Sequence, residues 1–106
     1  MPVIPLTDAT FGELVGSSDR TVLVDFTAAW CGPCRQLEPV LAAIADEQAD
    51  RLVVASIDVD VHLASAQRYG VMSFPTLIVF QDGEEQRRLV GARGKGRLLE
   101  DLAPHL

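Results

Sequence analysis

The only two cysteines of the chain lie within the sequence Trp30-Cys31-Gly32-Pro33-Cys34. Two thiols at this spacing can close into a disulfide, so the pair can store and deliver two electrons. A helix is expected to begin at the pair, and the N-terminal end of a helix stabilises negative charge through its unpaired N–H groups and its dipole. Cys31 is therefore the predicted nucleophile, whereas Cys34 falls inside the helix, shielded and less acidic. Pro33 suits the first helical turn and stiffens the loop between the sulfurs.

The size and composition of the chain predict a single domain over residues 1–106. With 106 residues, of which 48% are hydrophobic, the chain can bury one core but not two. Its formal net charge of −6 and its nine scattered basic residues argue against nucleic-acid and anionic-membrane partners, because such surfaces require a basic patch. We expect a monomer.

The apolar runs of the chain, such as Leu77–Phe80, have the length of a strand and are far too short to span a membrane. Met1–Gly16 contains no uninterrupted apolar region typical of a secretory signal. We therefore expect a cytoplasmic protein, in which a Cys-x-x-Cys pair favours redox or metal chemistry over a structural disulfide. Structural zinc requires four ligands, and neither His62 nor His105 stands at ligand spacing, so we expect no metal and no cofactor beyond the redox-active cysteine pair.

The elements that must position the cysteines are strands and one long helix. Three runs are apolar at nearly every position, which is typical of strands covered on both faces. These runs are Thr21–Phe26, Leu52–Ile57 and Thr76–Phe80. Between the first two, a helix is predicted from Pro33 to about Ala49, with a kink at Pro39.

Shorter elements complete the pattern. Thr7 or Asp8 is predicted to cap one helix, and Asp60 to cap another that ends near Gly70. The remaining elements are a hairpin turn at residues 81–84, a strand at Gln86–Val90 and a final helix over Gly94–Leu106. The resulting order, βαβαβαββα, predicts an α/β fold in three α/β/α layers, with a central mixed five-stranded sheet flanked by four helices.

Four motifs, taken together and in this order, resemble those of the thioredoxin family. They are Asp25-Phe26 in a buried strand, Trp30 to Cys34, Phe74-Pro75-Thr76 before a strand, and Val90-Gly91 after the last strand. The resemblance runs from about Thr7 to the C-terminus. It implies the thioredoxin fold, a cis peptide bond at Phe74-Pro75 facing the dithiol, and reduction of disulfide-containing protein substrates. It also implies recharging by a flavin-containing thioredoxin reductase.

The resemblance implies roles for residues around the dithiol. A cis proline at position 75 would expose the backbone of Phe74, so that an extended substrate segment could pair with it as an added strand. An apolar rim around this segment would comprise Trp30, Phe74 and Ala92, and the substrate-binding residues would also include Gly32, Pro33, Pro75 and Gly91.

Asp25 is expected to be buried, because Val24 and Phe26 flank it in an apolar strand. A carboxylate buried below the dithiol, with no cation beside it, holds its proton to a higher pH because it is desolvated. Asp25 is therefore predicted to take the proton of Cys34 when that thiol attacks. Ser56 stands where many family members carry a buried lysine, and Thr27 where many carry an aromatic residue.

Two alternatives to a disulfide reductase remain open from the sequence. One is a more oxidising disulfide oxidase or isomerase, although the Gly32-Pro33 pair resembles that of reducing relatives. The other is a non-catalytic binding subunit in which the fold matters and the thiols are dispensable. The residues before the cis proline, Met72-Ser73-Phe74, also differ from the Ile or Val usual in the family, which leaves partner preference open.

Overall fold

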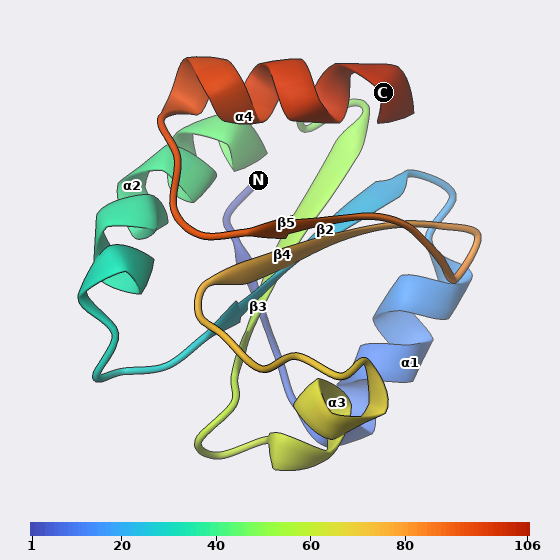
Figure 1. The fold of residues 1–106 in the computed structure, drawn as a ribbon. Coiled ribbons are helices and arrows are strands. Elements are labelled where there is room, and N and C mark those ends of the chain that lie inside the picture. Colours follow the sequence, from blue (N-terminus) through green and yellow to red (C-terminus); the bar gives the residue numbers. More distant parts are fainter.

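A computed structural model of the protein describes residues 1–106, which form five strands, four α-helices and one short 3₁₀ turn at the C-terminal end (Figure 1). The strands are β1 (Ile4–Leu6), β2 (Thr21–Thr27), β3 (Leu52–Asp58), β4 (Thr76–Gln81) and β5 (Glu84–Val90). The helices are α1 (Asp8–Ser17), α2 (Gly32–Glu47), α3 (Leu63–Arg68) and α4 (Lys95–Leu102), followed by the 3₁₀ turn Ala103–His105. This is the element order predicted from the sequence.

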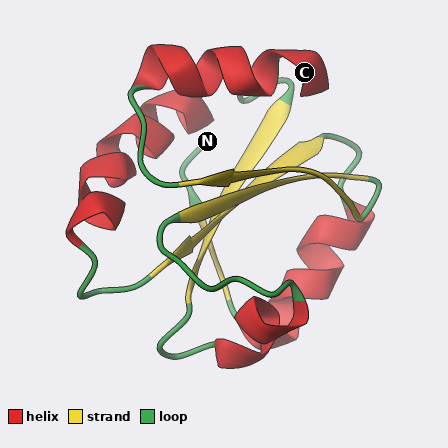
Figure 2. Ribbon diagram, viewed as in Figure 1, coloured by secondary structure: helices red, strands yellow, loops and turns green.

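The five strands form one mixed sheet in the order β1-β3-β2-β4-β5. Strands β1 and β2 pair in parallel with β3, whereas β4 runs antiparallel to both β2 and β5. Helices α1 and α3 cover one face of the sheet, and α2 and α4 cover the other (Figure 2). The predicted three-layer α/β architecture is confirmed.

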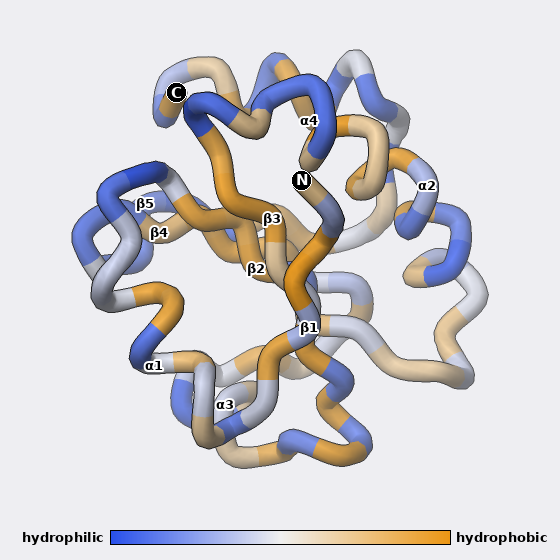
Figure 3. The backbone as a smooth tube through the Cα atoms, turned by 180° about the vertical axis from the view of Figure 1, so that it is seen from behind, coloured by the Kyte–Doolittle hydropathy of each residue, from blue (hydrophilic) through white to orange (hydrophobic).

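Strand β2 lies at the centre of the sheet and is buried on both faces. Val24 and Phe26 pack toward α1 and α3, while Leu23 belongs to the cluster under α2 and α4. Side chains alternate along a strand, so Asp25 shares the face of Leu23 and lies beneath α2. Figure 3 shows the hydrophobic residues gathered along β2 and β3, and hydrophilic residues along the outer helices. The most buried strand of the protein thus carries a carboxyl group.

The long helix begins and ends close to its predicted limits. Its N-cap is Cys31, and Pro33 lies in its first turn, where a missing N–H leaves no helical hydrogen bond unmade. Pro39 lies inside the helix, as expected. Thr7 caps α1 through a reciprocal pair of hydrogen bonds with Thr10, which confirms one of the two predicted caps.

Two helix predictions were wrong. Asp60 does not cap α3: the N-cap is His62, and the side chain of Asp8 instead accepts hydrogen bonds from the backbone N and Oγ of Ser65 at 2.9 and 2.7 Å. The final helix does not continue to Leu106. It ends at Leu102 and gives way to a 3₁₀ turn, because Pro104 has no N–H to continue the α-helical ladder.

The two open edges of the sheet are short or charged. Strand β1 has three residues, one of which is Pro5, a residue without an N–H for a further ladder. Strand β5 carries charges of both signs along its exposed stretch, with Glu84 and Glu85 followed after one residue by Arg87 and Arg88. Arg88 pairs with Glu85 at 2.9 Å.

Candidate active site

Cys31 and Cys34 are joined by a disulfide at the start of α2, with their Cα atoms 5.3 Å apart. Cys31 is the N-cap residue, and its sulfur accepts a hydrogen bond from the backbone N–H of Cys34 at 3.2 Å. That N–H is one of the donors that a helix leaves unpaired at its first turn, so it is available to stabilise a thiolate on Cys31. Cys34 is fully buried, whereas 4% of the surface of Cys31 is exposed.

The loop between β2 and α2 is fixed by hydrogen bonds on both sides of the disulfide. The backbone N–H of Cys31 donates to the carbonyl of Ala28 at 3.1 Å. The guanidinium of Arg35 donates twice to the carbonyl of Ala29, at 3.2 and 2.6 Å. The sulfurs are therefore held at one place, where the buried end of β2 meets α2.

An exposed apolar surface lies next to the disulfide. Trp30 is 66% exposed, its ring stands perpendicular to that of Phe74 at a centroid distance of 5.9 Å, and its Nε1 donates to Asp60 at 3.2 Å. Met72, just before Phe74, is 92% exposed. The bond between Phe74 and Pro75 is cis, as the resemblance implies. Two of the predicted rim residues, Trp30 and Phe74, are thus in direct contact.

One of the two glycines predicted at this surface, Gly91, is hydrogen-bonded to the cis proline. The backbone N–H of Gly91 donates to the carbonyl of Pro75 at 2.9 Å, and Gly91 has a φ of +94°, which favours glycine. Ala92, next to it, lines a depression against α2 together with Leu37 and Val40. Gly32 and Pro33 are exposed in the first turn of α2.

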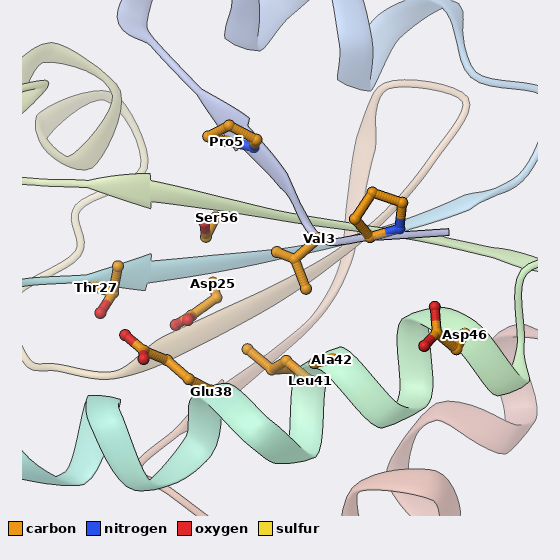
Figure 4. Close-up of a pocket in the computed structure, with 10 residues that line it drawn as sticks. Val3, Pro5, Asp25, Thr27, Glu38, Leu41, Ala42, Asp46 and Ser56 are labelled. Carbon is orange, nitrogen blue, oxygen red and sulfur yellow. The ribbon is translucent and has the colours of Figure 1, made fainter.

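Asp25 is the buried carboxyl group of the site, with 1% of its surface exposed, and its Oδ1 has no hydrogen-bond partner. Burial raises the pKa of Asp25 from 3.8 to about 7, and the nearby carboxylate of Glu38 adds to the rise. In the sheet its neighbours are Ser56 on β3 and Leu77 on β4, neither of which carries a charge. Figure 4 shows the carboxyl groups of Asp25 and Glu38 turned toward one another across a pocket.

Glu38 was not singled out from the sequence. The signal was present, because Glu38 follows Cys34 by four residues, and residues at that spacing share one face of a helix. Ser56 and Thr27, two of the positions that depart from the resemblance, line the same pocket. The substitutions therefore act on the surroundings of Asp25.

Comparison with known proteins agrees with this geometry. A family model described as Thioredoxin matches residues 2–104. The chain is 51% identical over 100 residues to a thioredoxin of Mycobacterium tuberculosis (strain H37Rv), covering 94% of this chain and 86% of that protein. The chain belongs to the thioredoxin family. A second thioredoxin, of Mycolicibacterium smegmatis, is 49% identical over 105 residues, covering 97% of this chain and 94% of that protein.

Membership of the thioredoxin family establishes the reaction class of the disulfide pair. The protein is a thiol-disulfide oxidoreductase of the protein-disulfide reductase type, with the dithiol of Cys31 and Cys34 as its redox centre. No three His, Cys, Asp or Glu side chains are grouped so that they could hold a metal ion. None of the helices combines the length and the apolar character needed to cross a membrane.

Replacement of Glu38 by Gln is expected to lower the pKa of Asp25 below about 7, because one of the two causes of its elevation is removed. Titration of the Asp25 side-chain carbon by NMR, in the oxidised protein, measures this directly. Glu47→Gln is the matched control, since Glu47 lies on the same helix but outside the pocket, paired with Lys95. An unchanged pKa in Glu38→Gln would show that the two carboxyl groups are not coupled.

Proposed function

We propose that Cys31 is the attacking thiol and Cys34 the resolving thiol of this thioredoxin-family protein. The Cys31 thiolate attacks one sulfur of a substrate disulfide, forming a mixed disulfide, and the second substrate sulfur leaves as a thiolate that takes up a proton. Cys34 then attacks the sulfur of Cys31, which releases the first substrate sulfur and leaves the protein oxidised. The support for this assignment is the hydrogen bond from the Cys34 N–H to the Cys31 sulfur together with the complete burial of Cys34.

Asp25 is the proposed general base for the resolving step. A base works best when its pKa lies near the operating pH, and the pKa of Asp25 is raised to about 7. Its unpaired oxygen lies under α2, and Glu38, which shares a helix face with Cys34, lines the same pocket. The proton taken from Cys34 balances the one taken up by the substrate thiolate that is released.

The proposed substrates are proteins that present a disulfide in an extended segment. The apolar surface of Trp30 and Phe74 would cover that segment, while the backbone around the cis peptide bond before Pro75 would pair with it. Gly32, Pro33, Gly91 and Ala92 are the proposed remaining contacts of the substrate.

The proposed electron donor is a thioredoxin reductase, which returns two electrons and two protons to the disulfide. The support is a Mycobacterium leprae protein described as a bifunctional thioredoxin reductase/thioredoxin. The chain is 51% identical to it over 100 residues, which cover 22% of the length of that protein. We further propose that residues 1–106 act as one monomeric domain in the cytoplasm, with no resident cofactor and no nucleic-acid or membrane partner. Two hydrophobic clusters on the faces of one sheet and a net charge of −6 support this.

Reduction of insulin tests the proposed function against its two alternatives. The protein is expected to precipitate insulin in the presence of dithiothreitol far faster than dithiothreitol alone, because it supplies a preformed thiolate. Cys31→Ser should give the background rate. A binding subunit would show no acceleration, and an oxidase would show a reduction potential well above that of a reductant when equilibrated with glutathione.

A further inference from the structure

A pocket of about 630 Å³ opens between β1, β2, β3 and α2 (Figure 4). Its inner end is polar, with Asp25, Thr27, Glu38 and Ser56. Its walls are apolar further along, and its outer end carries Asp46. The fold therefore leaves an open space with carboxyl groups at both ends and hydrocarbon between them.

The inner end has negative charge that nothing in the protein neutralises. The Oδ1 atom of Asp25 is buried without a hydrogen-bond partner, and the carboxylate of Glu38 is the charged group that faces it from α2. The other elements packed around Asp25 present uncharged residues, namely Pro5 on β1, Ser56 on β3 and Leu77 on β4. Burying an unpaired acceptor is unfavourable, and a bound hydrogen-bond donor would offset that cost.

The carboxylate at the outer end, that of Asp46, already has an ammonium partner. The N-terminal ammonium of Met1 donates to the carboxylate of Asp46 at 3.2 Å. The two acids on α2 that line the pocket, Glu38 and Asp46, are eight residues apart, or about 12 Å along a helix. The carboxylate at one end of the pocket is therefore paired with an ammonium group, whereas the carboxyl groups at the other end have no such partner.

The walls favour an organic cation over a bare metal ion. Val3, Leu41 and Ala42 line the space between the two ends, so an alkyl chain would be removed from water there. A metal ion would leave these walls uncovered, and the carboxyl groups are not clustered as metal ligands. The required ligand is a cation with a hydrogen-bond donor and a short hydrocarbon body.

We propose that this pocket binds a small aliphatic ammonium ion, with its ammonium group between Asp25 and Glu38 and its alkyl chain along Val3, Leu41 and Ala42. The inferred effect on catalysis rests on the proposed role of Asp25 as the base. A carboxylate neutralised by an ammonium is a weaker base, so a bound amine slows the release of the mixed disulfide. Binding itself does not depend on that role.

Binding is linked to the proton on Asp25. The ammonium ion binds the ionised carboxylate of Asp25, so it competes with the proton for this group. Its affinity therefore rises with pH through the pKa of about 7. Going from pH 6 to pH 8 raises the ionised fraction of such a group about tenfold. The alkylammonium stays charged over this range, so the change in affinity reports the carboxyl group. A pH-independent affinity would contradict this site.

The test uses hexylammonium chloride as the probe and the oxidised protein, followed by amide NMR at pH 6 and pH 8. We expect saturable shifts confined to residues around the pocket, with a dissociation constant about tenfold lower at pH 8. Hexanol supplies the chain without the charge, and ammonium chloride the charge without the chain. Shifts that do not saturate, or that hexanol reproduces, would overturn the proposal.

Three variants and a control localise the probe. At pH 8, where Asp25 is mostly ionised, Asp25→Asn and Glu38→Gln should each weaken binding. Ser56→Lys should abolish it, because position 56 pairs with Asp25 in the sheet and would supply an ammonium of the protein's own. Glu47→Gln should bind as the parent does. Binding unaffected by all three variants would place the probe elsewhere and overturn the assignment.

Two further outcomes separate this inference from the proposed function. If hexylammonium binds as described but leaves mixed-disulfide release unchanged, the pocket stands and the role of Asp25 as base fails. If N-acetyl-lysine methylamide binds at this site while hexylammonium does not, the occupant is a lysine side chain of a protein partner, and the small-molecule proposal is overturned.

Discussion

Cys34→Ser is expected to accumulate as a covalent adduct with its substrates and to lose nearly all turnover. The variant retains the Cys31 thiolate and its helix-terminal donor, so the first attack still forms a mixed disulfide. The second attack has no sulfur to perform it. Mass spectrometry of the adduct formed with a disulfide peptide, before and after addition of dithiothreitol, measures the trapped fraction.

The reciprocal variant provides the control. Cys31→Ser should form no adduct, because its remaining thiol is fully buried in α2. Brief alkylation of the reduced parent at neutral pH should likewise modify Cys31 first. Preferential adduct formation or alkylation at Cys34 would reverse the two assigned roles.

Asp25→Asn is expected to be more stable than the parent at pH 8 and slower to release its mixed disulfide. Burial raises the pKa of Asp25 from 3.8 to about 7. At ~1.4 kcal/mol for each pH unit, ionising this group in the folded state costs up to about 4 kcal/mol. The substitution removes that cost together with the base, and ordinary damage to the core would not raise stability.

The pH dependence separates this effect from any change in packing. Between pH 3.8 and about 7 the folded parent holds more protons than the unfolded chain, so its stability falls as pH rises through this window and levels off above it. A desolvated Asn amide adds a cost that does not vary with pH. The stability difference between Asp25→Asn and the parent should therefore grow from pH 4 to pH 8.

Urea unfolding at several pH values gives the first quantity, and single-turnover release of a mixed disulfide gives the second. A stability difference that is constant with pH would show that Asp25 titrates normally in the folded protein. An unchanged release rate would show that Cys34 loses its proton to another group.

The features of the fold that could be predicted from the sequence are those that depend on residue patterns within a single helix or strand. A strand that is buried on both faces is apolar at nearly every position. Residues 21–26 and 76–80 show this pattern, and both runs form central strands. The amphipathic spacing of Leu37 and Leu41 marked α2, and both side chains are buried. The burial of Asp25 followed from its apolar neighbours in the same strand, because a strand covered on both faces has no solvent-facing positions.

The features that were missed depend on contacts between distant segments. The first turn of α3 is satisfied by Asp8, which lies 57 residues before Ser65, so no local pattern could name it. Asp60, the residue that suited a local cap, instead accepts from Trp30 across the site. The pocket behind Asp25 needs β1, β3 and α2 together, and its shape appears only when these elements pack.

The open edges of the sheet bear on self-association at high protein concentration. Exposed strand edges are templates for pairing between molecules, and such pairing is how sheets grow into aggregates. Here one edge contains Pro5, which offers no N–H, and the other places Glu85 and Arg88 where a second strand would have to dock. Both edges therefore disfavour pairing with a strand of another molecule. The backbone beside Pro75 is the place where we propose that a substrate strand is added. Edges protected in this way are expected to keep the protein dispersed, while the proposed substrate surface would still recognise other chains through their backbones.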